Sequence, residues 1–384
     1  MNIGFACVWG ENREKTWSGS PYLLYESMKK LDGFNLYDLD INIKEFELLL
    51  YKILYLKLYK GKIKSKYIIS KLYLNSIKNK LFINLNKFKK IETLDTILEI
   101  GDISIIKNIP FYIYQDLSLD LIIRYLKENN KPISGFELFN LNDLYKRREW
   151  QFKIYEKCSG IFTASKWLAK SLVMDTGLPS KKVHVVHAGA NIIPDKINYP
   201  LLGKNKKETI ILFIGRDFFR KGGDIVVEAF KILKEKYSSN LKLIIIGQKY
   251  WPLNGEIPDG VVFLGDTRGE IIRKYYMTAD LFCMPSRFEA FGIVFAEALS
   301  FGVPCIGRKL CAMPEIVKPG INGYLIDNEN PENLAELMVK VLEDGDMKFK
   351  VKKLSNNYRG YYSWNRVASD MVKIMKYDQI KINC

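Results

Sequence analysis

Short apolar runs that end in glycine and lead into helices constrain the fold of this chain more than any other feature. Residues 210–214 form such a run, Gly215 ends it, and Gly222 and Gly223 precede an amphipathic helix. This order is typical of a buried parallel strand followed by a crossover helix. The alternation recurs in both halves of the 384-residue chain, and 48% of the residues are apolar, which is enough to bury two cores. The sequence therefore predicts an α/β protein with parallel sheets in two domains.

The domain boundaries are expected where this alternation is interrupted. We place the first domain at residues 1–195 and the second at residues 203–360, with a linker at residues 192–202. A further helix is expected within the C-terminal segment, residues 361–384. No tandem repeat of about 20 to 50 residues interrupts this organisation.

A strand-to-helix loop carries two candidate functional cations. Arg216 and Lys221 lie between the strand and the helix just described, at the carboxyl edge of the predicted sheet, where open α/β sheets bind ligands. An arginine and a lysine at this edge can neutralise a diphosphate, the first as a bidentate fork and the second as a mobile point charge. We expect the neighbouring Arg220 to be a solvated surface charge, the ordinary role of an arginine in a chain with a net charge of +16.

Two carboxylates enclose a segment that suits a long ligand with phosphates in its middle. Glu289 and Glu297 are eight positions apart, which in a helix corresponds to a rise of about 12 Å and nearly the same face. Between them, Gly292 permits close backbone approach, and the first amides of a helix attract phosphate because they have no acceptor within the helix. A nucleotide-sugar has this layout, with hydroxyls at both ends and a diphosphate between them. The alternative is an ordinary amphipathic helix with two solvated glutamates.

Further motifs extend this pattern over residues 209–345. In order and spacing they resemble the motifs of the retaining nucleotide-sugar glycosyltransferases of family 4. The resemblance implies the GT-B architecture, in which two Rossmann-like domains face each other across a cleft and the C-terminal helix packs back toward the N-terminal domain. The first domain would then bind the acceptor, and the second would bind the donor. The motifs are the loop at 215–223, the strands at 241–247 and 262–265, the strand end at 279–286, the carboxylate segment at 289–297, and the stretches at 314–317 and 322–326.

The resemblance also implies roles for individual residues. Arg216 and Lys221 would stabilise the leaving diphosphate, and Glu289 would bind hydroxyls of the donor sugar without acting as a nucleophile; these three residues form the predicted catalytic set. Glu297 would bind the ribose. The remaining predicted donor-binding positions, most of them backbone contacts to the diphosphate, are Gly19, Gly215, Phe291, Gly292, Ile293 and Val294.

The first half of the chain matches the family more loosely. Ser18 stands beside Gly19 where many relatives have paired glycines, and Gln115 or Asp116 falls where many relatives have a sugar-contacting histidine. His187 is interpreted as the end of a strand. In the second half, residues 310–313 are bulkier than the glycine-rich sequence usual in the family, so the pocket for the donor sugar is expected to differ in shape.

The predicted activity is transfer of a hexose from a nucleotide-diphosphate sugar, with UDP or GDP as the nucleotide, to a hydroxyl of a saccharide or glycolipid acceptor. The expected reaction retains the anomeric configuration, needs neither a metal nor another cofactor, and serves polysaccharide or glycolipid biosynthesis of the cell envelope or surface. Two alternatives stay open, a nucleotide-sugar epimerase of the same fold and a non-catalytic module that binds sugar nucleotides or membranes. The sequence leaves the base, the sugar, the acceptor and the oligomeric state open.

Metal, redox and targeting signals point to a simple intracellular enzyme. Asp38 and Asp40 form a D-x-D pair, but the pair closes an early strand, so we expect no metal site there. The six cysteines have no metal-ligand spacing and are expected to be buried and reduced. With no signal peptide and no apolar run near 18 residues, we expect a cytoplasmic protein, at most peripheral at the inner face of the membrane.

Much of the positive charge lies in residues 44–90, where lysines alternate with Leu, Ile and Tyr. At helical spacing this pattern produces basic amphipathic surfaces, which can bind anionic membranes. The alternative is a solvated lysine face packed on the first domain, and the sequence does not decide between the two. We expect no nucleic-acid partner, because no recognised nucleic-acid module accompanies the charge.

Overall fold

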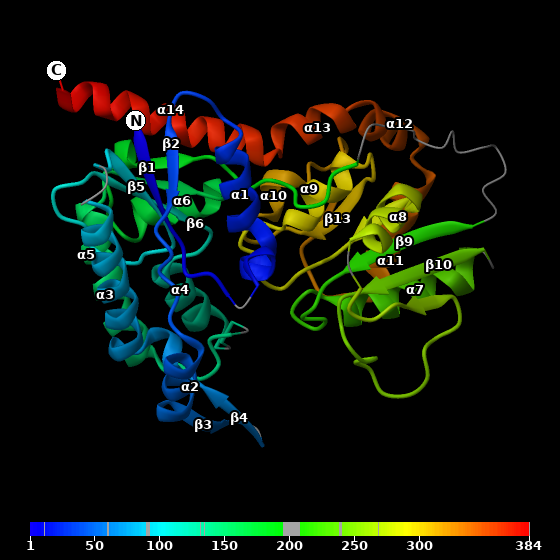
Figure 1. Cartoon of the computed structure of the whole chain (residues 1–384). Coiled ribbons are helices and arrows are strands. Elements are labelled where there is room, and N and C mark those ends of the chain that lie inside the picture. The colour runs from blue at the N-terminus through cyan, green and yellow to red at the C-terminus, as the bar shows by residue number, and fades with distance from the viewer. Residues whose placement is uncertain are drawn as a thin grey trace. The chain divides into compact units, whose positions relative to one another are not determined.

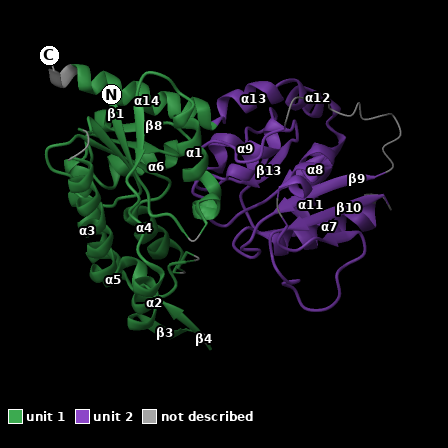
Figure 2. Cartoon of the chain, in the orientation of Figure 1, with its two compact units in different colours: residues 1–187, 364–384 green, residues 188–363 purple. Residues whose placement is uncertain are grey.

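The structure, a computed structural model, describes the chain except for residues 11, 60, 90–92, 131, 134, 195–207, 238–239, 268 and 384. The chain forms two compact units, one made of residues 1–187 and 364–384 and the other of residues 188–363 (Figure 2). Most of the predicted linker, residues 195–202, lies outside the described residues.

The first unit is built around a parallel six-stranded sheet with the strand order β2-β1-β5-β6-β7-β8 (Figure 1). Every residue of β5 and β6 is buried, as expected for central strands covered on both faces. The strands are β1 (Asn2–Ala6), β2 (Asn35–Asp38), β5 (Thr96–Ile100), β6 (Phe111–Gln115), β7 (Gly160–Thr163) and β8 (Val183–Val185). The main helices of this unit are α1 (Ser20–Lys29), α4 (Leu119–Asn129), α5 (Leu141–Lys157), α6 (Lys166–Met174) and α14 (Trp364–Asn383).

The last helix, α14, belongs to the first unit although it is the end of the chain. It packs along α1, and Tyr112 at the sheet donates a hydrogen bond of 2.8 Å from its hydroxyl to Asp378 Oδ2. The ring of Tyr114 meets the ring of Trp364 edge-on, with the centroids 6.3 Å apart. These side chains anchor the helix to the strand β6.

The lysine-rich segment differs from its predicted form. Two helices are present, α2 (Glu45–Leu54) and α3 (Lys71–Phe88), but residues 56–65 between them form an antiparallel hairpin of β3 (Leu56–Tyr59) and β4 (Lys62–Ser65), followed by a short 3₁₀ helix, η2 (Tyr67–Ile69). The prediction of helical surfaces throughout residues 44–90 was therefore wrong for this part. The cause is local, because apolar and polar residues alternate with a period of two around Gly61, whose φ of 72° suits a turn.

The second unit contains another parallel six-stranded sheet, with the order β11-β10-β9-β12-β13-β14. Together the two sheets confirm the predicted α/β class and its parallel strands. The strands are β9 (Thr209–Ile214), β10 (Leu241–Ile246), β11 (Val261–Phe263), β12 (Leu281–Cys283), β13 (Cys305–Arg308) and β14 (Gly323–Ile326). The helices are α7 (Gly223–Tyr237), α8 (Glu270–Thr278), α9 (Ile293–Ser300), α10 (Met313–Ile316), α11 (Pro331–Glu343), α12 (Gly345–Lys353) and α13 (Ser355–Tyr361).

The sequence predicted that the cysteines are buried, and this is confirmed for four of those that the structure describes. Cys7, Cys158, Cys283 and Cys305 are buried, and Cys311 is partly buried. None of the described helices is both long enough and apolar enough to cross a membrane.

Close backbone packing fixes the carboxyl edge of the second sheet. Gly247 follows β10 with a φ of 126°, and a Cβ atom at this position would lie 2.6 Å from the carbonyl carbon of Gly215 and 2.8 Å from the amide nitrogen of Arg216. Only glycine tolerates both this conformation and this distance. The peptide bond between Gly215 and Arg216 therefore rests directly on Gly247.

We predict that Gly247→Ala lowers the free energy of unfolding by about 2 kcal/mol or more, because it introduces both a clash and backbone strain. Gly345→Ala is the matched control, since a Cβ atom there meets nothing within 4 Å and the residue begins the helix α12. We expect the control to be neutral or slightly stabilising. Urea unfolding of both variants measures the difference, and equal stability would contradict the packing described.

Candidate active site

The candidate site lies on two loops that leave neighbouring strands of the second sheet. Residues 215–222 follow β9, and residues 284–292 follow β12, which pairs with β9. Gly222, with a φ of 78°, lies so close to the second loop that a Cβ atom would be 2.6 Å from the carbonyl oxygen of Pro285. The two loops are therefore in direct backbone contact at the carboxyl edge of the sheet.

An ion pair joins two of the three predicted catalytic residues on these loops. Lys221 Nζ donates to Glu289 Oε2, and both side chains are largely buried. Burial lowers the pKa of the Lys221 ammonium, and the nearby Glu289 carboxylate opposes that shift. The pair thus keeps a positive charge in a site from which most water is excluded.

The two arginines of the first loop do not behave as the sequence suggested. Arg220 was expected to be a solvated surface charge, and this was wrong: its side chain is about three-quarters buried. It contacts Asp217 at 3.0 Å and donates from Nη1 to the carbonyl oxygen of Phe288 at 2.6 Å. Arg216 is the exposed one, with 59% of its side chain accessible and a loose ion pair of 3.8 Å to Asp266. Arg220 therefore supports the loops, whereas Arg216 is accessible to a ligand.

A second arginine of structural importance was missed in the sequence. Arg287 donates to both carboxylate oxygens of Asp224 at 2.8 and 2.9 Å, and to Glu329 at 2.8 and 2.9 Å. Its backbone amide donates to the carbonyl oxygen of Arg220 at 2.7 Å. The only sequence signal was a cation directly after a strand end, and its two acidic partners lie far apart in the chain.

The carboxylate segment is half loop and half helix. Glu289 lies in the loop, and α9 begins at Ile293, so the helical second half required by the prediction is present. Gly292 caps the helix with a φ of 91°, and a Cβ atom there would meet the ring of Phe295 at 2.8 Å. The first amides of α9, at Ile293 and Val294, have no acceptor within the helix and are suited to bind an anion.

Glu297 lies inside α9 and is buried. Its Oε1 accepts hydrogen bonds from the amides of Asn191 and Ile192 at 3.2 and 3.1 Å, and its Oε2 accepts one of 2.8 Å from the hydroxyl of Tyr276. Burial raises the pKa of this carboxyl to about 7, although the three hydrogen bonds oppose the shift. Both oxygens are thus held by the protein itself, a feature the sequence did not indicate.

The other predicted donor-binding positions lie on or beside the two loops already described. Gly215 ends β9, and its amide donates to the carbonyl oxygen of Ile246 at 2.8 Å. Phe291 is buried, with its ring 6.2 Å from that of Tyr362. The bulkier stretch at residues 310–313 touches the loop as well, since the amide of Ala312 lies 3.5 Å from the carbonyl oxygen of Glu289.

The first unit holds the other residues that the sequence singled out. Gly19 caps the N-terminus of α1 with a φ of 98°. Gln115 is buried at the end of β6 and bonds to Tyr155 and Asp102, whereas Asp116 is exposed. His187 lies two residues after β8, and burial lowers its pKa to about 4, so its imidazole is neutral at pH 7.

In the D-x-D pair, the carboxylate of Asp38 already accepts hydrogen bonds from protein side chains. Asp38 accepts from Arg13 at 2.5 Å and from the Trp9 indole at 3.4 Å. Across the part of the chain that the structure describes, no three His, Cys, Asp or Glu side chains are grouped so as to hold a metal ion.

Comparison with known proteins shows what this chain is similar to. Residues 198–359 match the family described as "Glycosyl transferases group 1". An uncharacterized glycosyltransferase of Methanocaldococcus jannaschii is 30% identical over 245 residues, which is 58% of this chain and 60% of that protein. A phosphatidyl-myo-inositol mannosyltransferase of Mycobacterium leprae is 26% identical over 233 residues, or 59% of this chain and 60% of the relative. The chain thus spans about three-fifths of the length of these curated relatives.

Solved structures show the same fold over nearly the whole chain. A sucrose-phosphate synthase from Thermosynechococcus elongatus superposes with a TM-score of 0.69 at 16% identity, covering 100% of both chains. Anabaena HepE in complex with UDP-glucose gives a TM-score of 0.64 at 16% identity, covering 98% of this chain and 100% of the other. The fold is therefore the GT-B fold of glycosyltransferases, as the sequence predicted.

The raised pKa of Glu297 predicts a pH dependence of stability. Because the native carboxyl holds its proton up to about pH 7, whereas the unfolded one releases it near 4.5, stability falls as the pH rises through this window. The expected loss is on the order of 3 kcal/mol. Glu297→Gln cannot titrate and should lose clearly less stability between pH 5 and pH 8.

The measurement is urea unfolding at both pH values, with Glu256→Gln as the control because Glu256 is exposed in the same unit. The control should follow the wild type. A Glu297→Gln variant with the same pH dependence as the wild type would show that this carboxyl is not the group responsible.

Proposed function

We propose that this protein is a retaining glycosyltransferase that moves a hexose from a nucleotide-diphosphate sugar to an acceptor hydroxyl. The observation that carries the proposal is the Lys221–Glu289 ion pair on two adjoining loops, beside the glycine-capped start of α9. A buried cation, a carboxylate and a set of helix-terminal amides together match the charge and hydroxyl pattern of a nucleotide-sugar. The group 1 glycosyl transferase match over residues 198–359 supports this interpretation.

The proposed chemistry depends on stabilising the leaving group. The bond between the sugar C1 and the diphosphate oxygen breaks, and the acceptor oxygen forms a bond to C1 on the same face. The acceptor proton passes to the departing phosphate, so the step requires no protein base. Lys221 and Arg216 would stabilise the negative charge that develops on the diphosphate, and Glu289 would hold the sugar hydroxyls. With two cations in this role, the reaction would proceed without a metal.

The donor and acceptor are proposed on chemical grounds and by analogy. The complex of HepE with UDP-glucose makes UDP-hexoses the first donors to test, with GDP-hexoses second. The name of the mycobacterial relative, a phosphatidyl-myo-inositol mannosyltransferase, favours a lipid-carried acceptor. A role in cell-envelope polysaccharide or glycolipid biosynthesis follows from such an acceptor.

The first test concerns the two cations. Arg216→Ala should lower turnover more than tenfold without loss of stability, since losing one preorganised electrostatic contact costs about 2.7 to 4 kcal/mol in a well-studied enzyme. Lys221→Met should also lower turnover more than tenfold, but it leaves the buried Glu289 without its partner and should lower stability as well. Lys231→Ala, an exposed cation on α7, should leave turnover unchanged. Turnover is measured as release of nucleoside diphosphate together with glycosylated product.

A double variant separates catalysis from structure. If Lys221 only neutralises Glu289, then Lys221→Met combined with Glu289→Gln removes both charges and should turn over as fast as Glu289→Gln alone. If Lys221 stabilises the diphosphate, the double variant should turn over clearly more slowly than Glu289→Gln alone, as we expect. Conversion of the nucleotide-sugar to its epimer without transfer would contradict the proposed function.

We also propose that the first unit contacts anionic membranes through a surface formed by α2 and the β3–β4 hairpin. These elements lie together at one end of the unit, away from the sheet (Figure 1). No residue of α2 is buried, and Phe46, Leu49, Leu50 and Ile53, which share one helix face, are each 54% to 59% exposed. An apolar stripe of this kind suits the interface of a bilayer.

The hairpin continues the same pattern. Leu58 lies directly opposite Ile63, and the two side chains are 76% and 73% exposed. On the other face of the ribbon, Lys57 lies directly opposite Lys64. Lys64 also forms an ion pair of 3.7 Å with Glu137, which offsets part of the repulsion between the two lysines. The proposed surface combines these cations with exposed apolar side chains, as binding to an anionic membrane requires.

Vesicle sedimentation tests the membrane contact. Phosphatidylglycerol vesicles should capture the wild-type protein at low salt and release part of it at high salt, whereas neutral vesicles should capture little. Lys57→Gln combined with Lys64→Gln should reduce capture about thirtyfold, at about 1 kcal/mol per lysine. Leu58→Ser combined with Ile63→Ser should also reduce it. Lys350→Gln with Lys353→Gln, on α12, is the control. Failure of the wild type to sediment at low salt would show that the lysines form a solvated face.

A further inference from the structure

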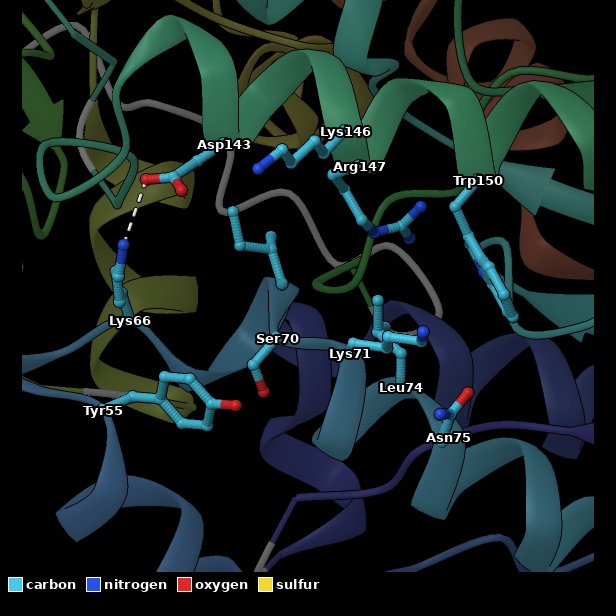
Figure 3. A pocket seen from close by; sticks show the side chains of 11 residues that line it. Tyr55, Lys66, Ser70, Lys71, Leu74, Asn75, Asp143, Lys146, Arg147 and Trp150 are labelled. Atoms are coloured by element: carbon cyan, nitrogen blue, oxygen red, sulfur yellow. Dashed lines mark hydrogen bonds and ion pairs between the residues drawn. The ribbon is translucent and has the colours of Figure 1, made fainter.

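A cavity of about 320 Å³ in the first unit lies outside the candidate active site. It is enclosed by α5 on one side and by the segment from the end of α2 to the start of α3 on the other (Figure 3). This volume is at the lower end of small-molecule sites and suits a compact group. Its lining includes Tyr55, Lys71, Leu74, Lys146, Arg147 and Trp150.

Arg147 is the charged group most tightly held in the cavity wall. Its side chain is only 9% exposed, and its Nη2 pairs with Asp102. Asp102 in turn accepts hydrogen bonds from Gln115 at 3.3 Å and from Gln151 at 3.0 Å, which fixes the guanidinium against the carboxyl ends of β5 and β6. The other terminal nitrogen, Nη1, is buried and has no hydrogen-bond partner among the described residues. Buried donors are rarely left in this state unless a ligand or water completes them.

A second buried donor lies beside the first. Trp150 follows Arg147 by three positions on α5, so the two side chains share one helix face (Figure 3). Its indole Nε1 is also buried without a hydrogen-bond partner in the described structure. Two hydrogen-bond donors without partners on adjacent turns of one helix suit a ligand group that has several acceptor oxygens.

The charges around the cavity favour an anion. Lys66 is neutralised by Asp143, with Nζ and Oδ2 3.1 Å apart. Lys71 and Lys146 have no ion-pair partner in the part of the chain that the structure describes, and both are exposed at the rim. An entering anion would therefore find two ammonium groups without an ion-pair partner at the rim and the buried guanidinium of Arg147 in the wall. A phosphate monoester offers several oxygens to such a set of donors.

Part of the remaining wall is apolar or aromatic, beside the polar Ser70 and Asn75. Ile69, Leu74, Tyr55 and the ring of Trp150 line the cavity next to the cations. A bare ion would leave these groups without a partner, whereas an alkyl or aromatic phosphate would cover them. The ligand is thus expected to be amphiphilic.

We propose that this cavity binds the phosphate group of an amphiphilic phosphate ester. Arg147 Nη1, Trp150 Nε1 and the two lysines contact the phosphate oxygens, and the organic part lies against Leu74 and the aromatic rings. The inference goes beyond the proposed glycosyl transfer, since none of these residues belongs to the predicted donor site. The ester is either a membrane lipid or a soluble metabolite, and the shared phosphate chemistry serves both.

Calorimetry with three probes tests the chemistry. Hexyl phosphate should bind the wild-type protein at least tenfold more tightly than inorganic phosphate, and hexanol should not bind measurably. Absence of hexyl phosphate binding overturns the proposal. Equal affinity for hexyl phosphate and inorganic phosphate overturns the amphiphilic part of it.

Matched variants locate the site. Leu74→Trp fills the cavity and should abolish hexyl phosphate binding, whereas Leu72→Trp lies on the same helix, outside the cavity and exposed, and should bind like the wild type. Lys146→Gln should weaken binding at least fivefold, and Lys153→Gln, exposed elsewhere on α5, should not. Binding that survives Leu74→Trp places the phosphate elsewhere and overturns the proposal.

A vesicle experiment identifies the source of the ligand. If Leu74→Trp also loses capture by phosphatidic acid vesicles while Leu72→Trp keeps it, the cavity takes a membrane lipid headgroup. If both variants sediment like the wild type, the cavity takes a soluble ester. None of these readouts requires glycosyl transfer, so failure of the proposed enzyme activity would leave this test intact.

Discussion

The ion pair between Lys221 and Glu289 is the interaction on which the candidate site depends. Each side chain is largely buried, and removing either would leave an uncompensated charge away from water, which is strongly destabilising. The pair also joins loops from two neighbouring strands, and Arg220 and Arg287 strengthen the same junction. A buried pair of this kind fixes where the positive charge lies before any ligand binds, which is the condition for electrostatic catalysis.

Three glycines allow the close backbone packing at this junction between the two loops. Gly222 lets one loop touch the backbone of the other, Gly247 supports the peptide bond before Arg216, and Gly292 starts α9 beside Glu289. In each case a Cβ atom would lie under 3 Å from a neighbouring atom. The groups that we propose to meet a ligand are the first amides of α9, the exposed Arg216 and the Lys221 ammonium. In this proposal the backbone amides and the side-chain cations bind the anion together.

The two anion sites that we propose, one in each unit, are built in different ways. In the second unit, the candidate donor site combines helix-terminal amides with a buried lysine. In the first, Arg147 and Trp150 present buried donors from the middle of a helix, and an aspartate at the sheet edge holds the arginine in place. The apolar surface of α2 and the hairpin adjoins this cavity in sequence. Tyr55, which follows α2 directly, is one of the residues that line the cavity. The proposed phosphate site and the proposed membrane surface are therefore close together in the first unit.

The sequence determined the α/β class, the parallel strands, the loop after β9 and the helix after Gly292, because glycine position and apolar periodicity are local signals. It did not reveal that Arg220 is buried, that Arg287 joins Asp224 and Glu329, or that Glu297 is held by Tyr276, because each partner is distant in the chain. Nor did the charge pattern of residues 44–90 reveal the hairpin or the cavity at its base. Charge and burial are properties of the folded neighbourhood, so only the tertiary structure decided which cations are structural and which are free to bind.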